Sequence, residues 1–410
     1  MALIVQKYGG TSVGSTERIR RVADRCLRTQ AEGHDVVVVV SAMSGETNRL
    51  LELVRAISDT PSMREQDAVV STGEQVSVGL LALAIQRLGG KARSFTGQQV
   101  RILTDSVHGK ARIKEIDGSV IRASLANKEI VVVAGFQGVD ANGDITTLGR
   151  GGSDTSAVAI AAALGADACE IYTDVEGVYT TDPNLVKEAR RLERISYEEM
   201  MELASQGAKV LQIRAVEAAM KYRVPLWVKS SFTDGPGTLV CEEDKAMEDV
   251  LVSGIAFDRN EAKITVRDVP DKPGMAAQLF GALDAKQISV DLIVQNLSRK
   301  GMTDLTFTVT QADLKVAEES IRQVAQEIGA GEVESDENVS KVSIVGVGMR
   351  NHSGVAARMF QVLGAEGINV QMISTSEIKV SCVVRSEHTE RAVQALHAAF
   401  GLDREADTRA

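Results

Sequence analysis

Glycines, hydroxyl side chains and one lysine gather within nine residues near the start of the chain, Lys7-Tyr8-Gly9-Gly10-Thr11-Ser12-Val13-Gly14-Ser15. Glycine N–H groups can approach an oxyanion closely, a helix N-terminus adds positive potential, and Lys7 supplies a full charge. Leu3–Val5 precedes this stretch as a strand-like run, and Ile19–Leu27 follows with helical spacing, capped by Ser15 or Thr16. The stretch could therefore hold a phosphate, although it matches neither GxxxxGK[ST] nor GxGxxG. An ordinary strand-to-helix turn is an equally good interpretation of the stretch by itself.

A second glycine-rich segment, Thr147-Leu148-Gly149-Arg150-Gly151-Gly152-Ser153-Asp154, precedes another helical pattern. Ser153 or Asp154 is expected to cap a helix that runs through Ala157–Leu164, and Gly165 is expected to end it. Arg150 adds a cation between the glycines, and Lys209 adds one further along the chain. These features predict two anion-binding loops at one edge of a sheet.

Composition excludes several classes of function. A net charge of −10 and an aromatic content of 3% argue against nucleic acid as the main partner. The histidines and the four cysteines are scattered, so we expect no zinc site and no disulfides, and any metal should arrive as magnesium with a substrate phosphate. No apolar run approaches the ~18 residues of a membrane span, and the chain starts with a strand-like run instead of a signal peptide. We therefore expect a cytoplasmic protein without a membrane partner.

Residues 1 to about 240 alternate apolar runs with helical patterns, and the runs include 36–40, 130–133 and 224–228. Continuous apolar strands between amphipathic helices indicate a mostly parallel sheet that is covered on both faces. The charged segment Glu242–Asp249 marks a boundary, and a length of 410 residues allows two or three domains.

Beyond this boundary the sequence repeats itself with an offset of 80 residues at eight apolar or glycine positions. The matched residues are Gly274, Ala276, Ala277, Phe280, Leu283, Ile288, Val290 and Ile293 with Gly354, Ala356, Ala357, Phe360, Leu363, Ile368, Val370 and Ile373. The first copy continues with a strand at 305–309, a helix from about 313 and a weak strand near 333. The second copy has a strand at 379–384 and a helix at 388–399, and it then lacks the last strand that the first copy has. The segment 250–257 could supply that strand, which predicts that the first copy is inserted into the second.

Together these motifs resemble the aspartokinases of the amino-acid kinase superfamily. The two glycine-rich segments are similar to the family's first two signature blocks. The family's third block is similar to the segment Thr173-Asp174-Val175-Glu176-Gly177-Val178-Tyr179-Thr180-Thr181-Asp182-Pro183. The repeat resembles the family's paired ACT domains. The resemblance implies an α/β fold with an open, mostly parallel sheet sandwiched by helices, followed by two ferredoxin-like ACT domains. It implies a kinase domain at 1–245, a first ACT domain at 262–337, and a second formed by 250–257 plus 338–404.

The resemblance also implies an activity: ATP-dependent phosphorylation of the L-aspartate side-chain carboxylate to 4-phospho-L-aspartate, which opens lysine, threonine and methionine biosynthesis. The implied catalytic residues are Lys7, Arg150 and Asp154. The implied aspartate-binding residues are Ser41, Thr47, Glu74 and Arg150. The implied ATP-binding residues are Lys7, Gly9, Gly10, Thr173, Asp174, Tyr179, Asp182, Lys209 and Val210.

The chemistry of these residues suits that reaction. A carboxylate with a pKa of about 3.9 is already an anion at neutral pH, so its phosphorylation needs no general base. Catalysis then depends on positioning and on positive charge, with Mg²⁺ arriving on the nucleotide. The planar fork of Arg150 suits an α-carboxylate, and Glu74 suits an ammonium group. Asp154 either orients Lys7, or helps to hold the metal–nucleotide, or is a simple helix cap.

One residue departs from the family pattern, because many relatives carry arginine after Asp-Pro where this chain has Asn184. Lys187 or Arg190 could substitute for it. We expect Asn184 to raise the KM for ATP without abolishing turnover.

The repeats are expected to bind the amino acids that inhibit the enzyme, lysine, threonine or both together, at an interface between paired copies. The implied effector-binding residues are Asp271, Gly274, Met275, Ala276, Asp291, Gln295, Asn296, Val355, Ala356, Asn369, Val370, Ser376 and Glu377. Ser353 stands where the first copy has Pro273, so the second copy could bind weakly or serve only in pairing. We expect a homo-oligomer formed through ACT pairing, and a smaller subunit could start at Met247.

Three alternatives remain at this stage. An acetylglutamate or uridylate kinase would have no use for Glu74 and would generally lack the paired repeat. A non-enzymatic amino-acid sensor should have lost Lys7, Arg150 or Asp154, all of which are present. A bifunctional enzyme with an attached dehydrogenase would need a further Rossmann-type segment.

Overall fold

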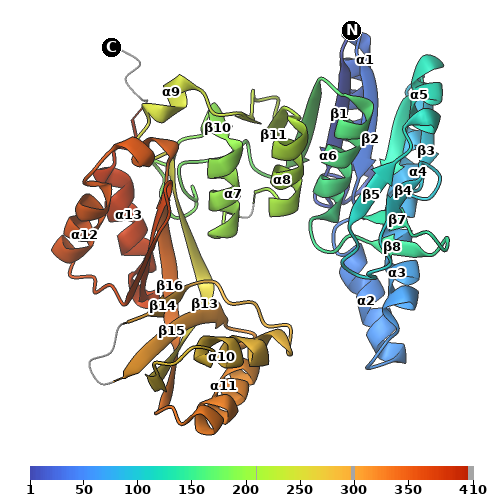
Figure 1. Ribbon diagram of the computed structural model, residues 1–410. Coiled ribbons are helices and arrows are strands. Elements are labelled where there is room, and N and C mark those ends of the chain that lie inside the picture. Colours follow the sequence, from blue (N-terminus) through green and yellow to red (C-terminus); the bar gives the residue numbers. More distant parts are fainter. Residues whose placement is uncertain (209, 297–300, 405–410) are drawn as a thin grey trace. The chain divides into compact units, whose positions relative to one another are not determined.

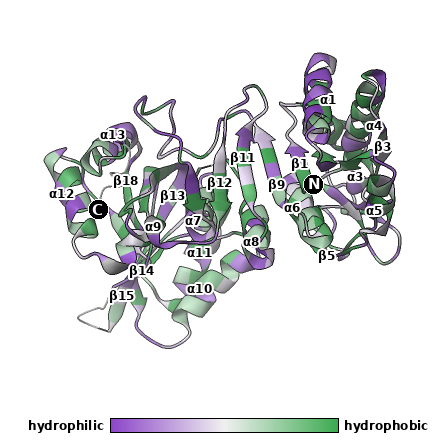
Figure 2. Cartoon of the chain, turned by 90° about the horizontal axis from the view of Figure 1, so that it is seen from above, coloured by the Kyte–Doolittle hydropathy of each residue, from purple (hydrophilic) through white to green (hydrophobic). Residues whose placement is uncertain are grey.

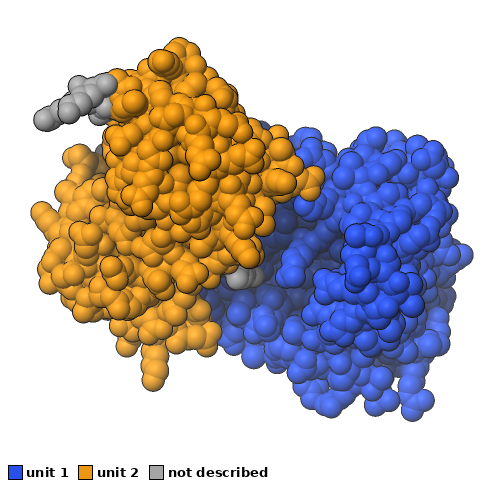
Figure 3. Space-filling model, turned by 90° about the horizontal axis from the view of Figure 1, so that it is seen from below, with its two compact units in different colours: residues 1–179, 191–204, 209–245 blue, residues 180–190, 205–208, 246–410 orange. Residues whose placement is uncertain are grey.

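The computed structural model describes residues 1–208, 210–296 and 301–404 and divides the chain into two compact units. Unit 1 comprises residues 1–179, 191–204 and 209–245, and unit 2 comprises residues 180–190, 205–208 and 246–410 (Figure 3). A short segment that the sequence assigns to the kinase region, 180–190, therefore packs with the residues of the repeats.

An eight-stranded sheet forms the centre of unit 1, in the order β10-β12-β11-β9-β1-β2-β6-β3 (Figure 1). Its strands are β1 Leu3–Tyr8, β2 Asp35–Val40, β3 Ala92–Phe95, β6 Ile130–Ala134, β9 Ala168–Thr173, β10 Arg194–Ser196, β11 Leu226–Ser230 and β12 Thr238–Cys241. All neighbouring strands are parallel except β11 and β12. The mostly parallel sheet predicted from the apolar runs is confirmed.

Helices cover both faces of this sheet. They are α1 Thr16–Ala31, α2 Glu46–Ile57, α3 Met63–Val70, α4 Thr72–Arg87, α5 Ser119–Ala126, α6 Gly152–Leu164, α7 Tyr197–Ser205 and α8 Ile213–Tyr222. Helices α1 and α4 share one hydrophobic core with Val36, Val38 and Val40, while α6 packs along β1. Because side chains alternate along a strand, the valines between them face the opposite side, and all five valines of β2 are buried. Figure 2 shows the hydropathy of the residues along the helices and strands of the chain.

The helices α3 and α4 follow one another so closely that Met63–Arg87 is long and apolar enough to cross a membrane by length and composition alone. Half of its most apolar part is buried, with Leu81 and Ile85 fully inside the core. The core helix of a soluble protein passes the same test, so this stretch is weak support for a membrane span.

A second sheet of unit 1 has four short strands in the order β5-β4-β7-β8. They are β4 Ile102–Thr104, β5 Ile113–Ile116, β7 Gln137–Val139 and β8 Ile145–Thr147. Strand β8 leads directly into the second glycine-rich segment, so this sheet determines where Arg150 begins its loop.

Unit 2 contains one antiparallel six-stranded sheet in the order β14-β15-β13-β16-β18-β17. Its strands are β13 Gly254–Pro270, β14 Ile293–Gln295, β15 Met302–Thr310, β16 Val333–Val345, β17 Met372–Thr375 and β18 Lys379–Arg385. Its main helices are α10 Met275–Asp284, α11 Leu314–Ile328, α12 Val355–Ala365 and α13 Thr389–Ala399, with the short α9 Lys245–Glu248 before them. Separate hydrophobic cores lie under α10 with α11 and under α12 with α13.

The two repeats are joined through two long strands. The first part of β13, Gly254–Asp258, pairs with the last part of β16, and the second part of β13 pairs with its beginning. The strand that precedes the first repeat therefore lies beside the second repeat. We propose the domain division 1–245, 262–337, and 250–257 plus 338–404, which this pairing supports.

Candidate active site

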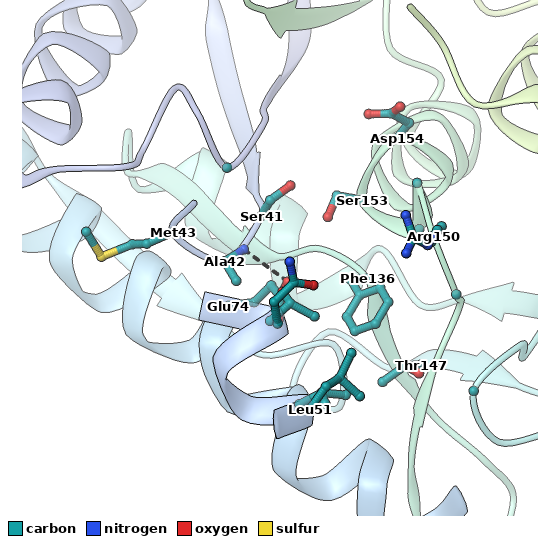
Figure 4. Close-up of a pocket in the computed structure, with 18 of the residues that line it drawn as sticks. Ser41, Ala42, Met43, Leu51, Glu74, Phe136, Thr147, Arg150, Ser153 and Asp154 are labelled. Atoms are coloured by element: carbon teal, nitrogen blue, oxygen red, sulfur yellow. Dashed lines mark hydrogen bonds between the residues drawn. The ribbon is translucent and has the colours of Figure 1, made fainter. Parts of the chain in front are cut away.

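A cavity of about 710 Å³ opens in unit 1 at the carboxyl ends of β1 and β2, where open α/β sheets place their ligands. Seven residues singled out by the sequence line it: Lys7, Gly10, Ser41, Thr47, Glu74, Arg150 and Asp154. Figure 4 shows Ser41, Glu74 and Arg150 around one hollow. The structure thus brings together all the residues for which the sequence analysis expected catalysis or aspartate binding.

Lys7 and Asp154 form an ion pair, with 2.7 Å between Nζ and Oδ1, and each side chain is only 11% exposed. The partners come from the end of β1 and the first turn of α6. Helix α6 begins at Gly152 with Gly151 as its N-cap, so the expected cap at Ser153 or Asp154 is wrong. Asp154 lies too far into the helix to cap it, and its carboxylate meets the lysine instead. The expected end of α6 at Gly165 and the Ser15 cap of α1 are confirmed.

Two glycines are required by the close approach of neighbouring chain segments. A Cβ on Gly10 would stand 2.9 Å from the carbonyl oxygen of Ala42, in the loop that carries Ser41. Gly151 has a φ of +68°, and a Cβ there would stand 2.0 Å from the Cγ of Gln212. Backbone can therefore line the cavity at both positions without a side chain between it and a ligand.

Glu74 is almost completely buried in the first turn of α4. One carboxylate oxygen accepts a hydrogen bond of 3.0 Å from the Ala42 N–H, drawn as a dashed line in Figure 4, while Oε2 has no hydrogen-bond partner. Burial raises the pKa of Glu74 from 4.5 to about 7, and the Ala42 N–H lowers it only in part. A buried carboxylate with an unused oxygen is suited to receive a cationic group from a ligand.

The sequence analysis missed the residue that organises the far wall of the cavity. Asp67 of α3 is fully buried and accepts hydrogen bonds from Gly109 N–H, Thr147 N–H and Thr147 Oγ1, at 2.9, 3.0 and 2.6 Å, and contacts the His108 ring at 3.1 Å. It thereby holds the end of β8, just before Arg150, against the 108–110 loop. A single aspartate within an amphipathic helix carries no motif, so no sequence signal identified it. Lys110 and Phe136 also line the cavity and were also missed.

The residues expected to bind ATP are more widely distributed. Gly9 adjoins Lys7, since a Cβ there would lie 3.4 Å from Nζ. Thr173 ends β9, the neighbour of β1, and Asp174 follows it; their side chains are joined by a 3.1 Å hydrogen bond. Asp182 belongs to the segment of unit 2, whereas Tyr179 and Val210 belong to unit 1. The expected residue Lys209 lies outside the described residues.

Asn184, where the resemblance implies arginine in many relatives, is engaged with its own loop. Its backbone N–H and its side-chain amide both donate to Asp182 Oδ1, at 2.8 and 3.0 Å. This is a local turn of the kind that asparagine and aspartate commonly form.

The residues expected to bind effectors all lie in unit 2, at corresponding places in the two repeats. Gly274 and Gly354 are the N-caps of α10 and α12, with φ of +96° and +97°. Helix α10 begins with Met275 and Ala276, and helix α12 begins with Val355 and Ala356. Asp271 precedes α10. The remaining residues lie in or beside the edge strands β14 and β17: Gln295, Asn296, Asn369, Val370, Ser376 and Glu377. Asp291 lies apart from the helix starts and pairs with the buried Lys341 of β16.

One group within the described residues could hold a metal ion by proximity, because ligand atoms of His108, Asp140 and Asp144 lie within 4.8 Å of one another. Its carboxylates already have partners, since Asp140 accepts from Ser106 Oγ at 2.7 Å and Asp144 pairs with Arg64 at 2.6 Å. The group therefore has a structural explanation without an ion.

Comparison with known proteins agrees with this architecture. The model of the amino acid kinase family matches residues 2–230, and two ACT domain models match residues 264–326 and 342–400. An aspartokinase of Pseudomonas aeruginosa is 60% identical over 405 residues, which are 98% of each chain. An aspartokinase of Mycolicibacterium smegmatis is 50% identical over 98% of this chain and 97% of its own. The crystal structure of E. coli aspartokinase III in complex with aspartate and ADP is similar over 97% of this chain and 99% of its own, with a TM-score of 0.79 and 29% identity.

Proposed function

The chain belongs to the aspartokinase family, and from this we propose that it transfers the γ-phosphoryl group of ATP to the side-chain carboxylate of L-aspartate. The products are 4-phospho-L-aspartate and ADP. One observation carries this proposal: a single cavity is lined by Lys7, Asp154, Arg150 and Glu74. The cations suit the phosphate and the α-carboxylate of a free amino acid, and Glu74 suits its ammonium group. The relative bound to aspartate and ADP supports the same pair of ligands.

In the proposed reaction an oxygen of the aspartate side chain attacks the γ-phosphorus, and the bond to the bridging oxygen of ADP breaks. No proton has to be removed, because the acceptor is already ionised. The enzyme must instead overcome repulsion between two anions, and Lys7 supplies positive charge where they meet. Asp154 holds the Lys7 ammonium in place through the 2.7 Å ion pair.

The remaining charged residues select the substrate. Arg150 presents a guanidinium that can bind the α-carboxylate with two parallel hydrogen bonds. Glu74 can accept the α-ammonium group on its unpartnered Oε2. Ser41 and Thr47 line the same cavity and offer hydroxyl groups to aspartate or phosphate. An acetylglutamate or uridylate kinase would leave Glu74 without a cation, which is costly for a buried carboxylate.

ATP is proposed to bind through Lys7, Gly9, Gly10, Thr173, Asp174, Tyr179, Asp182, Lys209 and Val210. Asp154 fits a magnesium ion that arrives with the nucleotide, because oxygen ligands suit Mg²⁺ and this carboxylate lies beside the lysine that faces the phosphates. When bound, Mg²⁺ neutralises charge on the phosphates.

We also propose feedback inhibition by lysine, threonine or both acting together at the ACT repeats, at the first step of lysine, threonine and methionine biosynthesis. Support comes from the matching helix N-caps in the two repeats and from the E. coli relative solved with lysine and aspartate. The outermost strands β14 and β17 expose Ile293 and Ile373 at equivalent repeat positions, which supports a homo-oligomer formed by ACT pairing. A separate small subunit starting at Met247 and a cytoplasmic location remain part of this proposal.

The decisive experiment is an ATP-dependent hydroxamate assay with L-aspartate as the acceptor. N-acetyl-L-glutamate serves as an alternative acceptor in the same assay, and uridine monophosphate as one that is followed by release of ADP, because its product forms no hydroxamate. Lysine, threonine and their mixture serve as inhibitors. We expect hydroxamate from aspartate alone, and stronger inhibition by the mixture than the two separate effects predict. Turnover with another acceptor but not with aspartate would refute the proposed substrate.

A further inference from the structure

The third glycine-containing motif is divided between the two compact units within a single hairpin. Its base lies in unit 1, where Leu192 N–H donates to the Val178 carbonyl at 2.8 Å and Tyr179 forms a β-bridge with Arg191. Its outer part, residues 180–190, belongs to unit 2. The proposed nucleotide residue Asp182 is therefore carried by a segment that packs with the second ACT repeat.

Apolar and backbone contacts hold this segment in unit 2. Val186 is only 5% exposed and belongs to the core under α12 and α13. Ile255 N–H of β13 donates to the Thr180 carbonyl at 2.7 Å, and the Gln394 side chain of α13 donates to the Leu185 carbonyl at 3.2 Å. Asp182 stays exposed at the tip. The segment thus has an anchored side and a side that is available to a ligand.

The polar centre of this anchor is His397 of α13, which is 1% exposed. Its Nε2 lies 2.9 Å from Oγ1 of Thr180, which is equally buried. The same Oγ1 accepts the backbone N–H of Arg190 at 3.0 Å, so the hydroxyl proton is available for His397 Nε2. A neutral His397 with its proton on Nδ1 can accept this hydroxyl proton on Nε2. One hydroxyl therefore connects both strands of the hairpin to α13.

A neighbouring cavity of about 420 Å³ makes this contact more important. It is lined by residues 184–188 of the hairpin and by Gln394, His397, Ala398 and Asp403. Because space lies between the outer hairpin and α13, the contacts around the cavity must hold the segment in place. Besides the histidine and Val186, the partly buried Leu185 and Ala189 pack against the same core, and Arg190 Nε donates to the Leu402 carbonyl at 3.1 Å.

We propose that His397 is a positioning residue for ATP binding: through Thr180 it holds the hairpin that carries the proposed nucleotide residue Asp182. This inference rests on the proposed function for the identity of the nucleotide. It assigns to a buried histidine of the repeat a role in substrate binding, without any contact with the substrate.

The charges around His397 favour the neutral form that this role needs. Burial and Arg190 lower the pKa of His397, and Asp403 and Glu188 only partly oppose this. Protonation would add an N–H to Nε2, so the hydrogen bond donated by Thr180 would be lost and a positive charge would be buried. We therefore expect the contact to hold at neutral pH and to weaken as the solution becomes acidic.

The test uses the full-length enzyme with Mg-ATP and combines calorimetric titration of nucleotide with the hydroxamate assay. His397→Leu removes the acceptor, and we expect the Kd and the KM for ATP to rise by about three- to tenfold, the value of one hydrogen bond, with the KM for aspartate unchanged. Thr180→Val should have the same effect, and the double variant should be no weaker than either single one. His397→Gln keeps an acceptor at the place of Nε2, so it should restore ATP affinity and remove the loss of affinity that we expect of the wild type in acidic solution.

His388→Leu, a change at a partly exposed histidine just before α13, is the matched control and should leave the ATP affinity unchanged. An unchanged ATP affinity in Thr180→Val, or equal losses in the KM for ATP and for aspartate, would overturn the inference. If His397→Leu fails to fold, Thr180→Val and the pH profile of His397→Gln decide the matter. Absence of aspartyl hydroxamate in the wild type would instead refute the proposed function, while the nucleotide titration would still report on the hairpin.

Discussion

Replacing Glu74 by glutamine tests the proposed amino-acid site through its dependence on pH. Burial holds the pKa of Glu74 at about 7, so in the free enzyme at pH 6 only about a tenth of the molecules carry the carboxylate there. An ammonium group binds the ionised form. We therefore expect the KM for aspartate in the wild type to fall by about tenfold between pH 6 and pH 8.

Glu74→Gln keeps the shape but loses the charge. The lost charge-assisted hydrogen bond is worth about 1.5–3 kcal/mol, so the KM for aspartate at pH 8 should rise by about ten- to hundredfold. Its dependence on pH should disappear, while the KM for ATP should change little. Initial rates in the hydroxamate assay from pH 6 to 8 give all of these values. Glu52→Gln, at an exposed position of α2, is the control.

The same substitution has an opposite effect on stability. Between pH 4.5 and about 7 the folded protein keeps a proton on Glu74 that the unfolded chain has lost, so the wild type loses stability as the pH rises through this range. Above pH 7 this loss amounts to about 3 kcal/mol, and glutamine avoids it. Glu74→Gln should therefore unfold at a higher denaturant concentration than the wild type at pH 8, and the difference should shrink at pH 5. A KM for aspartate that stays independent of pH in the wild type, together with no stability gain in the variant, would refute the assignment of an ammonium site to Glu74.

Three further substitutions test other contacts. Asp154→Asn removes the partner of Lys7, and kcat should fall by about a hundredfold with intact folding, as judged by circular dichroism. Lys341→Met leaves the buried Glu261 without its cation at 3.1 Å, so unfolding of the repeats should become easier by about 3 kcal/mol at pH 7 and by less in acid, where Glu261 takes up a proton. Asn184→Arg should lower the KM for ATP in initial-rate measurements, and an unchanged value would show that the missing guanidinium does not matter.

Local patterns were sufficient to predict the elements of both units but not all their contacts. The valine-rich runs predicted the parallel strands because a strand buried on both faces must be apolar throughout. The cap of α6 was misplaced because Gly151 can adopt a left-handed conformation as N-cap, which moves the start of the helix ahead of the polar residues. Lys341 looked like an ordinary strand residue, since only the assembled sheet brings Glu261 and Asp291 to it.

The site was predictable where motifs concentrate and unpredictable where a single side chain acts across the fold. Lys7 and Arg150 lie in glycine-rich segments, so their positive charges indicated binding of anionic ligand groups. Glu74 follows a short polar run, and its negative charge indicated binding of an amine. Asp67 makes its hydrogen bonds to residues 41 to 80 positions away, and nothing in its neighbourhood indicates them. The packing of 180–190 was equally hidden, because Leu185 and Val186 form too short an apolar pattern to indicate a partner.

The proposed aspartate-binding residues and Asp182 belong to different units, and this predicts for which substrate an inhibitor should raise the KM. All the residues proposed for aspartate, including Glu74 and Arg150, lie in unit 1, whereas Asp182 of the proposed nucleotide site packs with the second ACT repeat. An effector that changes the packing of this repeat should act on the hairpin at 180–190, because that hairpin packs within unit 2. We therefore expect lysine or threonine to raise the KM for ATP more than the KM for aspartate, measured as inhibition patterns with each substrate varied in turn. Inhibition that is purely competitive with aspartate would contradict this prediction, because all the residues proposed for aspartate lie in unit 1.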